Sequence, residues 1–135
     1  MTVPLSFIRA AVPLLLFSAF SAWSVEGKVL RVHMLSGSAE YKSAVSLPKW
    51  AKLLEKEGHV CTIASGVKEE VDVANLKNCD ALVVFCKRWK LQGEELEALK
   101  AVATKKPVIG IRTASHAFQT WLAFDNEVMG GTYSG

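Results

Sequence analysis

The sequence predicts a single α/β domain built on a parallel sheet, and three observations lead to that prediction. Apolar, strand-like segments alternate with helical segments along the chain. The connections between them are only a few residues long. Residues 80–86 include a continuous apolar run, which is typical of a strand covered on both faces of a parallel sheet. The length of 135 residues suffices for one domain but not for two.

Residues 1–24 have the pattern of a secretory signal peptide. Arg9 is the only charged residue before Glu26, and an apolar run over residues 10–23 follows it. This run is shorter than the roughly 20 residues that span a bilayer, but it suits the apolar region of a signal peptide. We expect cleavage near Ser24, an exported (periplasmic or secreted) protein and no membrane span after cleavage. An uncut N-terminal anchor is the alternative.

Residues 25–135 form the predicted domain, whose elements alternate in order. The predicted strands, rich in branched and apolar residues, are residues 28–34, 59–64, 80–86 and 107–111. The predicted helices are residues 47–58, 93–103 and 115 to about 122. Residues 36–43 are polar and predict a loop. Residues 65–77 are polar and predict a loop with up to one helical turn.

Local signals mark the ends of the predicted helices. Ser46 can cap the helix over residues 47–58, Pro48 suits its first turn, and Gly58 suits the position just after its end. The helix over residues 93–103 has acidic residues in its first turn and a lysine near its end, as the helix dipole favours.

The segment after Trp121 contains no run typical of a closing strand and helix. A four-stranded parallel sheet would leave an exposed edge, which native folds usually cover. We therefore expect an incomplete domain whose missing remainder adds strands.

The composition excludes several classes of protein. Sixteen basic and 13 acidic residues are interspersed and give a net charge of +3, so we expect no nucleic-acid partner. The three cysteines, Cys61, Cys79 and Cys86, match no zinc-binding spacing. We interpret them as buried small hydrophobic residues, at least one of which is unpaired within the chain.

Three motifs of the chain together resemble a known family. They are Glu40-Tyr-Lys-Ser-Ala-Val-Ser-Leu-Pro48, Asp80-Ala-Leu-Val-Val-Phe85 and Lys106-Pro-Val-Ile-Gly-Ile-Arg-Thr-Ala-Ser-His-Ala-Phe118. Over residues 28–135 the chain resembles the ThuA-like (trehalose-utilisation) family, in particular its exported bacterial members. The resemblance implies a flavodoxin-like fold of the class I glutamine amidotransferase-like type. Residues 130–133 resemble an internal segment of that family, which agrees with an incomplete domain.

The resemblance also implies where a nucleophile would stand. The related amidotransferases present a cysteine in a sharp turn after a strand, and residues 110–114 match that turn. Arg112 occupies the cysteine position, and a guanidinium is permanently protonated and only donates hydrogen bonds. Thr113 and Ser115 lie too late in the turn to replace the cysteine. We therefore expect no glutaminase activity.

Candidate site residues follow the predicted strands, because ligands of parallel α/β sheets bind outside the carboxyl ends of the strands. Arg112, Thr113, Ser115 and His116 form a polar cluster after the fourth strand. Arg112 suits a carboxylate, a phosphate or vicinal hydroxyls, and His116 suits general acid–base catalysis. The turn is also expected to open a helix whose first N–H groups favour an anionic or hydroxyl-rich ligand. A purely structural role for the cluster is the alternative.

The loop after the first strand contributes Glu40 as a second catalytic candidate and Tyr41 as a ligand-binding candidate. We expect this loop to lie near Arg112 and His116, because strands joined by consecutive crossovers usually lie side by side or near the switch point of the sheet. An ordinary solvated acid is the alternative for Glu40.

Other chemistry-bearing residues give weaker signals. His33 lies within the first strand and is interpreted as a core histidine. His33, Glu40 and His116 have no metal-binding spacing, so we expect no metal site. Residues 87–90 (Lys-Arg-Trp-Lys) predict a solvated turn, with stacking of the tryptophan on a sugar ring as the alternative.

Two functions follow from these features, and the sequence leaves both open. One is a carbohydrate-related enzyme that hydrolyses or modifies a glycoside, which the family resemblance implies and to which Asp125 and Glu127 could add carboxylates. The other is a non-catalytic module that binds a sugar or another small molecule. A flavin-binding domain is disfavoured, because no phosphate-cradling turn follows the first strand in the usual manner. The sequence predicts no particular cofactor and no oligomeric state.

Overall fold

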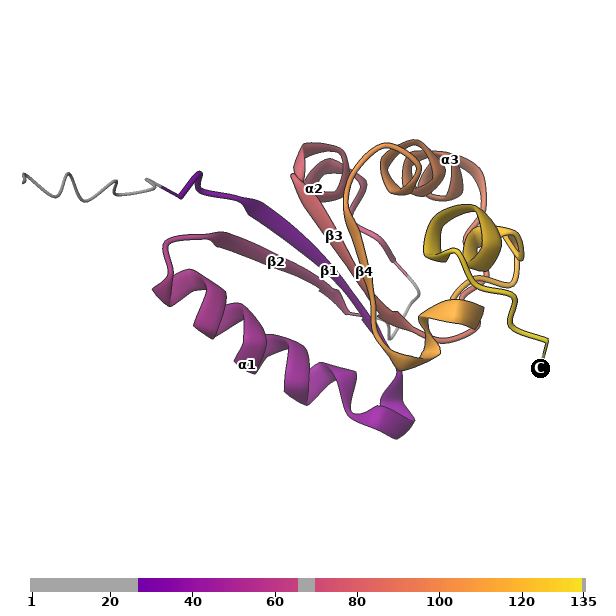
Figure 1. The fold of residues 1–135 in the computed structure, drawn as a ribbon, viewed down its shortest axis with the longest axis horizontal. Coiled ribbons are helices and arrows are strands. Elements are labelled where there is room, and N and C mark those ends of the chain that lie inside the picture. The colour runs from indigo at the N-terminus through magenta and orange to yellow at the C-terminus, as the bar shows by residue number, and fades with distance from the viewer. Residues whose placement is uncertain (1–26, 66–69, 135) are drawn as a thin grey trace, which may run out of the picture.

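A parallel sheet forms the centre of the protein. The computed structural model describes residues 27–65 and 70–134. Within them, β1 (Arg31–Gly37), β2 (Val60–Ser65), β3 (Ala81–Cys86) and β4 (Val108–Gly110) pair in the order β2-β1-β3-β4 (Figure 1). All three pairings are parallel. The predicted α/β class with a parallel sheet is confirmed, and the arrangement is flavodoxin-like.

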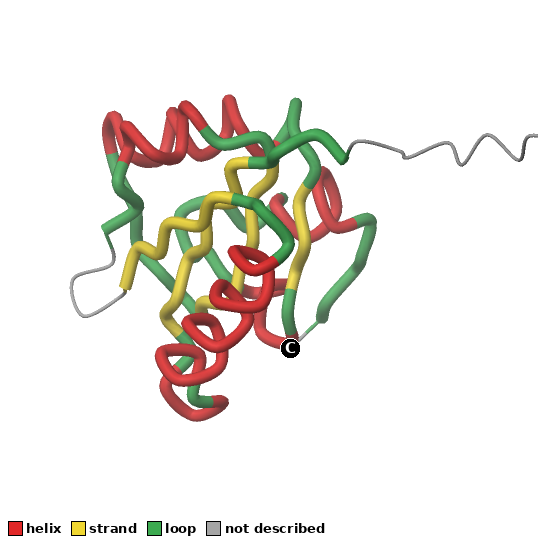
Figure 2. The backbone as a smooth tube through the Cα atoms, turned by 90° about the vertical axis from the view of Figure 1, so that its left-hand side faces the viewer, coloured by secondary structure: helices red, strands yellow, loops and turns green. Residues whose placement is uncertain are grey.

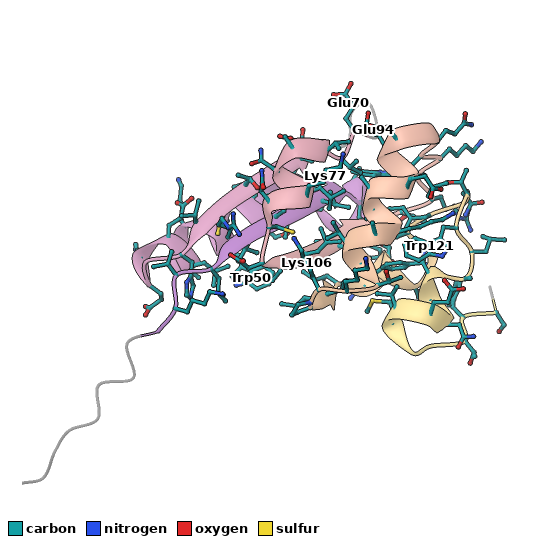
Figure 3. All side chains as sticks on the ribbon, turned by 90° about the horizontal axis from the view of Figure 1, so that it is seen from above. Trp50, Glu70, Lys77, Glu94, Lys106 and Trp121 are labelled. Carbon is teal, nitrogen blue, oxygen red and sulfur yellow. The ribbon has the colours of Figure 1, made fainter. Side chains whose placement is uncertain are left out.

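Helices cover both faces of the sheet. The helix α1 (Ser43–Lys56) lies on one face, and α2 (Val73–Asn78) and α3 (Gly93–Ala103) lie on the other (Figures 1 and 2). Lys77 of α2 and Glu94 of α3 lie side by side, with Nζ and Oε1 3.1 Å apart (Figure 3). The protein therefore has three layers, with an apolar core on each side of the sheet.

The two central strands, β1 and β3, contribute side chains to both cores. Met34 and Val83 pack in the core under α1, whereas Leu35, Leu82 and Val84 pack in the core under α2 and α3. Successive side chains of a strand point to opposite faces, so a strand covered on both faces is apolar at every position. This explains the continuous apolar run that predicted β3.

The start of α1 differs from the prediction. The strand β1 continues to Gly37, because it lies between β2 and β3 and pairs with both. The helix then begins at Ser43, not at residue 47. Ser46 is therefore no cap; its hydroxyl donates to the Lys42 carbonyl at 3.2 Å, and Pro48 lies inside the helix. The local capping signals predict the wrong start for α1, because Ser43 lies in a buried network of hydroxyl groups after β1.

Other helix ends agree with the prediction. The helix α3 spans residues 93–103 as expected, with Glu94 and Glu95 in its first turn. Gly58 follows the last turn of α1 with a φ of +88°, a left-handed conformation that glycine adopts without steric cost. In the described part of the polar segment before β3, residues 73–78 form the short helix α2, whose N-cap Asp72 accepts a hydrogen bond from the Asn75 N–H.

The predicted helix over residues 115–122 is wrong. The chain forms a short 3-10 helix, η2 (Arg112–His116), and then an irregular segment that leads to a π-helical turn, η3 (Asp125–Met129). Phe118, Trp121 and Phe124 cluster in the core, with ring centroids 5.0 to 6.4 Å apart. Their burial against α3 and the sheet, rather than helix propensity, sets the path of this segment.

The cysteines behave largely as the sequence predicts. Cys79 and Cys86 are buried and Cys61 is half-buried, and no disulfide joins them. Burial raises the pKa of the Cys79 thiol, so this group stays a thiol at neutral pH.

The predicted signal peptide, residues 1–24, lies outside the described residues. In the part of the chain that the structure does describe, no helix is long and apolar enough to cross a membrane.

Candidate functional site

The candidate residues from two separate loops meet at the carboxyl edge of the sheet. Tyr41 ends the short 3-10 helix η1 (Ala39–Tyr41) after β1, and Arg112 follows β4. The guanidinium carbon of Arg112 lies 4.1 Å from the centroid of the Tyr41 ring. The strands β1 and β4 are not neighbours, because β3 lies between them. The loops therefore meet across the end of β3, not beside a shared strand pair.

The turn after β4 is sharp, and its backbone is strained. Arg112 has a φ of +47°, a left-handed conformation that is uncommon for a residue other than glycine. Gly110 lies two residues earlier, and a Cβ at this position would collide with the Met129 side chain and crowd Ala114. A glycine two residues before a strained residue, after a strand, resembles the first half of a nucleophile elbow, in which an α-helix follows the turn. Here the strained position holds a guanidinium, and only the short 3-10 helix η2 follows.

Tyr41, Arg112, Thr113 and His116 line an open pocket of about 350 Å³. Tyr41 keeps 39% of its surface exposed at the rim of the pocket, and the Arg112 guanidinium covers one face of its ring. Among residues 27–65 and 70–134, no carboxylate forms an ion pair with Arg112. The exposed guanidinium therefore keeps hydrogen-bond donors for a ligand.

His116 is held in the pocket by its neighbours. Its Nδ1 lies 3.2 Å from the Ser115 hydroxyl, and its ring stacks on Tyr133 with the centroids 4.7 Å apart. Burial lowers the pKa of His116, and the positive charges of Arg88 and Lys87 lower it further. The imidazole is therefore neutral at neutral pH and can accept a proton or a hydrogen bond.

Glu40 reaches the same region but is bound by a lysine. Both of its carboxylate oxygens accept from Lys87 Nζ at 2.8 Å. This contact lowers the pKa of Glu40, so the side chain stays ionised at neutral pH and is poorly suited to donate a proton. The pair also neutralises Lys87.

Thr113 and Ser115 support the turn. The Thr113 hydroxyl is buried, donates to the Cys86 carbonyl at 2.8 Å and lies 3.2 Å from the Ser38 hydroxyl. Thr113 thus attaches the turn to the ends of β1 and β3. It also lines the pocket. The expected helix N-terminus is missing, because η2 has only five residues and Ala114 N–H already donates to the Ile111 carbonyl.

The weaker candidates occupy structural positions. His33 is fully buried, with Nδ1 2.7 Å from the Thr62 hydroxyl and Nε2 2.9 Å from the Val71 carbonyl, so the core interpretation is confirmed. Trp89 is buried where a Cβ on Gly37 would collide with its indole, so neither a solvated position nor sugar stacking is right for it.

The two carboxylates after Trp121 also have structural partners. Asp125 accepts from the Tyr133 N–H at 2.6 Å, and Glu127 accepts from Trp121 Nε1 at 3.0 Å. In the described ranges no three His, Cys, Asp or Glu side chains gather to hold a metal ion.

Sequence reasoning missed two contributors to the site. Tyr133 lies 17 positions after His116 and carries no motif of its own; only the turn at Gly130, with a φ of +70°, brings it back. Arg88 donates its backbone N–H to the His116 carbonyl at 3.0 Å. The basic residues after β3 gave a signal for Arg88, because they follow a strand that ends at the same edge.

Comparison of the chain with family models, with curated proteins and with solved structures finds no match.

Proposed function

We propose that this chain is an exported ThuA-like domain that binds a carbohydrate or a similar hydroxyl-rich small molecule in the pocket of Tyr41, Arg112, Thr113 and His116. One observation carries the proposal: a strained turn presents the Arg112 guanidinium to the pocket, over an exposed aromatic ring and without an ion-pair partner among the described residues. Strained residues persist where the structure enforces them, and they cluster at functional sites.

The pocket has the chemistry that a sugar needs. The exposed part of the Tyr41 ring suits the apolar face of a sugar, while a guanidinium and a neutral imidazole suit its hydroxyls. The resemblance to the ThuA-like family, carried by the motifs around Tyr41 and His116, supports carbohydrate as the ligand class. The same resemblance, with Arg112 at the elbow, supports the absence of glutaminase activity.

Catalysis at this pocket is the second candidate function. His116 favours it, because a lowered pKa leaves the imidazole free to act as a general base at neutral pH. Glu40 does not complete an acid–base pair, because Lys87 keeps it ionised. Binding is therefore better supported than hydrolysis or modification of a glycoside.

Calorimetry on the full chain tests the proposal. We expect glucose or trehalose to bind the parent, and Arg112→Ala to weaken that binding by about 1.5–3 kcal/mol, the usual value of a hydrogen bond to a charged group. Lys49→Ala, which removes an exposed charge from α1, is the matched control and should leave binding unchanged. Equal binding by the parent and the Arg112→Ala and His116→Ala variants would place the site elsewhere.

The same preparation separates the two candidate functions. If the domain is an enzyme, incubation with trehalose releases reducing sugar, and His116→Ala stops the release while binding persists. If it is a binding module, trehalose is recovered intact from the parent.

A further inference from the structure

Three basic residues around the pocket share a strained backbone. Lys42, Arg88 and Arg112 have φ values of 54°, 55° and 47°, and they follow β1, β3 and β4 respectively. This left-handed conformation is unfavourable for every L-residue with a Cβ. The described chain uses glycine for it at three other turns, namely Gly58, Gly93 and Gly130.

The fourth strained residue has a structural reason that the three cations lack. Asp72 caps α2, where its carboxylate accepts from the Asn75 N–H at 3.2 Å and from Asn75 Nδ2 at 2.7 Å. The Lys42 side chain makes no capping hydrogen bond at the start of α1. The Lys42 backbone does end η1, because its N–H donates to the Ala39 carbonyl at 3.0 Å. Arg88 and Arg112 end no helix, and all three basic residues are exposed at the edge that carries the pocket.

The charges around the pocket do not cancel. Glu40 neutralises Lys87, but no ion pair forms on Arg88 or Arg112 within the described ranges. Arg88 lies close enough to His116 for its charge to lower the pKa of that ring. His116 is neutral and adds no charge, while Lys42 also forms no ion pair among the described residues and Asp125 adds one negative charge near His116. The remaining excess is positive, and it attracts an anion.

We propose that the ligand carries a carboxylate, which the planar guanidinium of Arg112 binds through both oxygens, with Arg88 adding attraction. The inference rests on the function proposed above and narrows its ligand class to a sugar acid. A planar fork of N–H groups matches the two coplanar oxygens of a carboxylate.

A phosphate fits the pocket less well, because it offers three oxygens and needs more donors. Two donors beside Arg112 are already used inside the protein. Thr113 donates to the Cys86 carbonyl, and the Ala114 N–H donates to the Ile111 carbonyl.

Calorimetry with four probes tests this assignment on the full chain: D-glucuronate, D-glucose, glucose 6-phosphate and lactate. We expect the parent to bind glucuronate at least about 10-fold more tightly than glucose, the factor that a charge-assisted hydrogen bond gives. Arg112→Lys keeps the charge but loses the fork, and should lose most of the preference. Lys49→Ala should keep it. The Nε–H resonance of Arg112 should shift when glucuronate binds.

Each remaining outcome decides one of the two proposals. Equal affinity for glucose and glucuronate would overturn the carboxylate inference and leave carbohydrate binding intact. If glucose 6-phosphate binds more tightly than glucuronate, the carboxylate inference is overturned and the ligand is inferred to carry a phosphate ester. If lactate shifts the Arg112 resonance but none of the sugar probes binds the parent, the carboxylate site is supported and the carbohydrate function is overturned. If no carboxylate binds the parent, the inference is wrong.

Discussion

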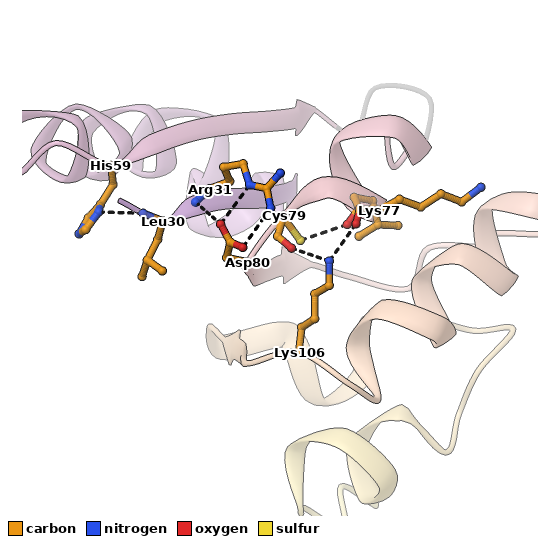
Figure 4. Close-up of polar contacts among 8 residues, drawn as sticks. Leu30, Arg31, His59, Lys77, Cys79, Asp80 and Lys106 are labelled. Carbon is orange, nitrogen blue, oxygen red and sulfur yellow. Dashed lines mark hydrogen bonds and ion pairs between the residues drawn. The ribbon is translucent and has the colours of Figure 1, made fainter. Parts of the chain in front are cut away.

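Two arginines at opposite edges of the same sheet show what separates a structural charge from a candidate functional one. At the amino edge, Arg31 donates through Nε and Nη2 to the two carboxylate oxygens of Asp80, each at 3.1 Å (Figure 4). The Arg31 backbone N–H donates to the same carboxylate at 2.9 Å. These contacts hold the pKa of Asp80 well below its ordinary range.

A second cation at the amino edge also has partners within the protein. Lys106 Nζ donates to the carbonyls of Lys77 and Cys79 at 2.8 and 2.5 Å, close to the Arg31–Asp80 pair (Figure 4). At the carboxyl edge, by contrast, Arg112 has an aromatic neighbour, a strained backbone and no ion pair within the described residues. The comparison shows that an arginine with a carboxylate partner stabilises the fold, whereas an arginine without one, on a strained turn, is available to bind a ligand.

The largest expected effect is on the packing that supports the carboxyl edge. Gly37→Ala places a Cβ against the Trp89 indole, which is buried and cannot move away without disturbing the core. We expect the free energy of unfolding to fall by about 1–3 kcal/mol. Urea denaturation measures it, with Gly27→Ala, whose Cβ would meet open space, as the control. Equal midpoints for both variants would show that Trp89 does not support this edge.

A smaller effect is expected at the amino edge, where Asp80→Asn removes the partner of Arg31. The lowered pKa of Asp80 means that its contribution to stability is present above the pKa of an unfolded aspartate, about 3.9, and is lost as the pH falls towards the folded value. The variant should therefore melt below the parent at pH 7, and the difference should shrink below pH 4.

Thermal melts from pH 7 to pH 2 check this prediction. Glu94→Gln, which breaks the exposed pair with Lys77, is the matched control and should change the melting temperature less. A difference between the Asp80→Asn variant and the parent that stays constant with pH would contradict the role assigned to the carboxylate.

The smallest effect compares the two arginines directly. Arg112→Gly relieves a left-handed backbone but loses the contact with Tyr41, so we expect a change of less than about 1 kcal/mol in the free energy of unfolding. Arg31→Gly loses the paired carboxylate and weakens a strand, and should lower the melting temperature. The contrast fails if Arg112→Gly destabilises the protein more than Arg31→Gly does.

The sequence by itself determined the layers of this fold. The continuous apolar run of β3 required cover on both faces of the sheet, and Gly58 stopped α1 where a left-handed residue was needed. These features are local or periodic, so they can be recognised in a single sequence. The same reasoning placed Tyr41, Arg112 and His116 at one edge of the sheet, because the carboxyl ends of parallel strands share an edge.

Only the tertiary structure decided how that edge is built. The capping signals at Ser46 and Pro48 gave way to the Ser43 network, and burial of Phe118 and its aromatic neighbours replaced a predicted helix by η2 and an irregular segment. The pairing of Glu40 with Lys87, and the stacking of Tyr133 on His116, join residues far apart in the chain. No local pattern encodes such contacts, because they depend on where packing of the whole core places each loop.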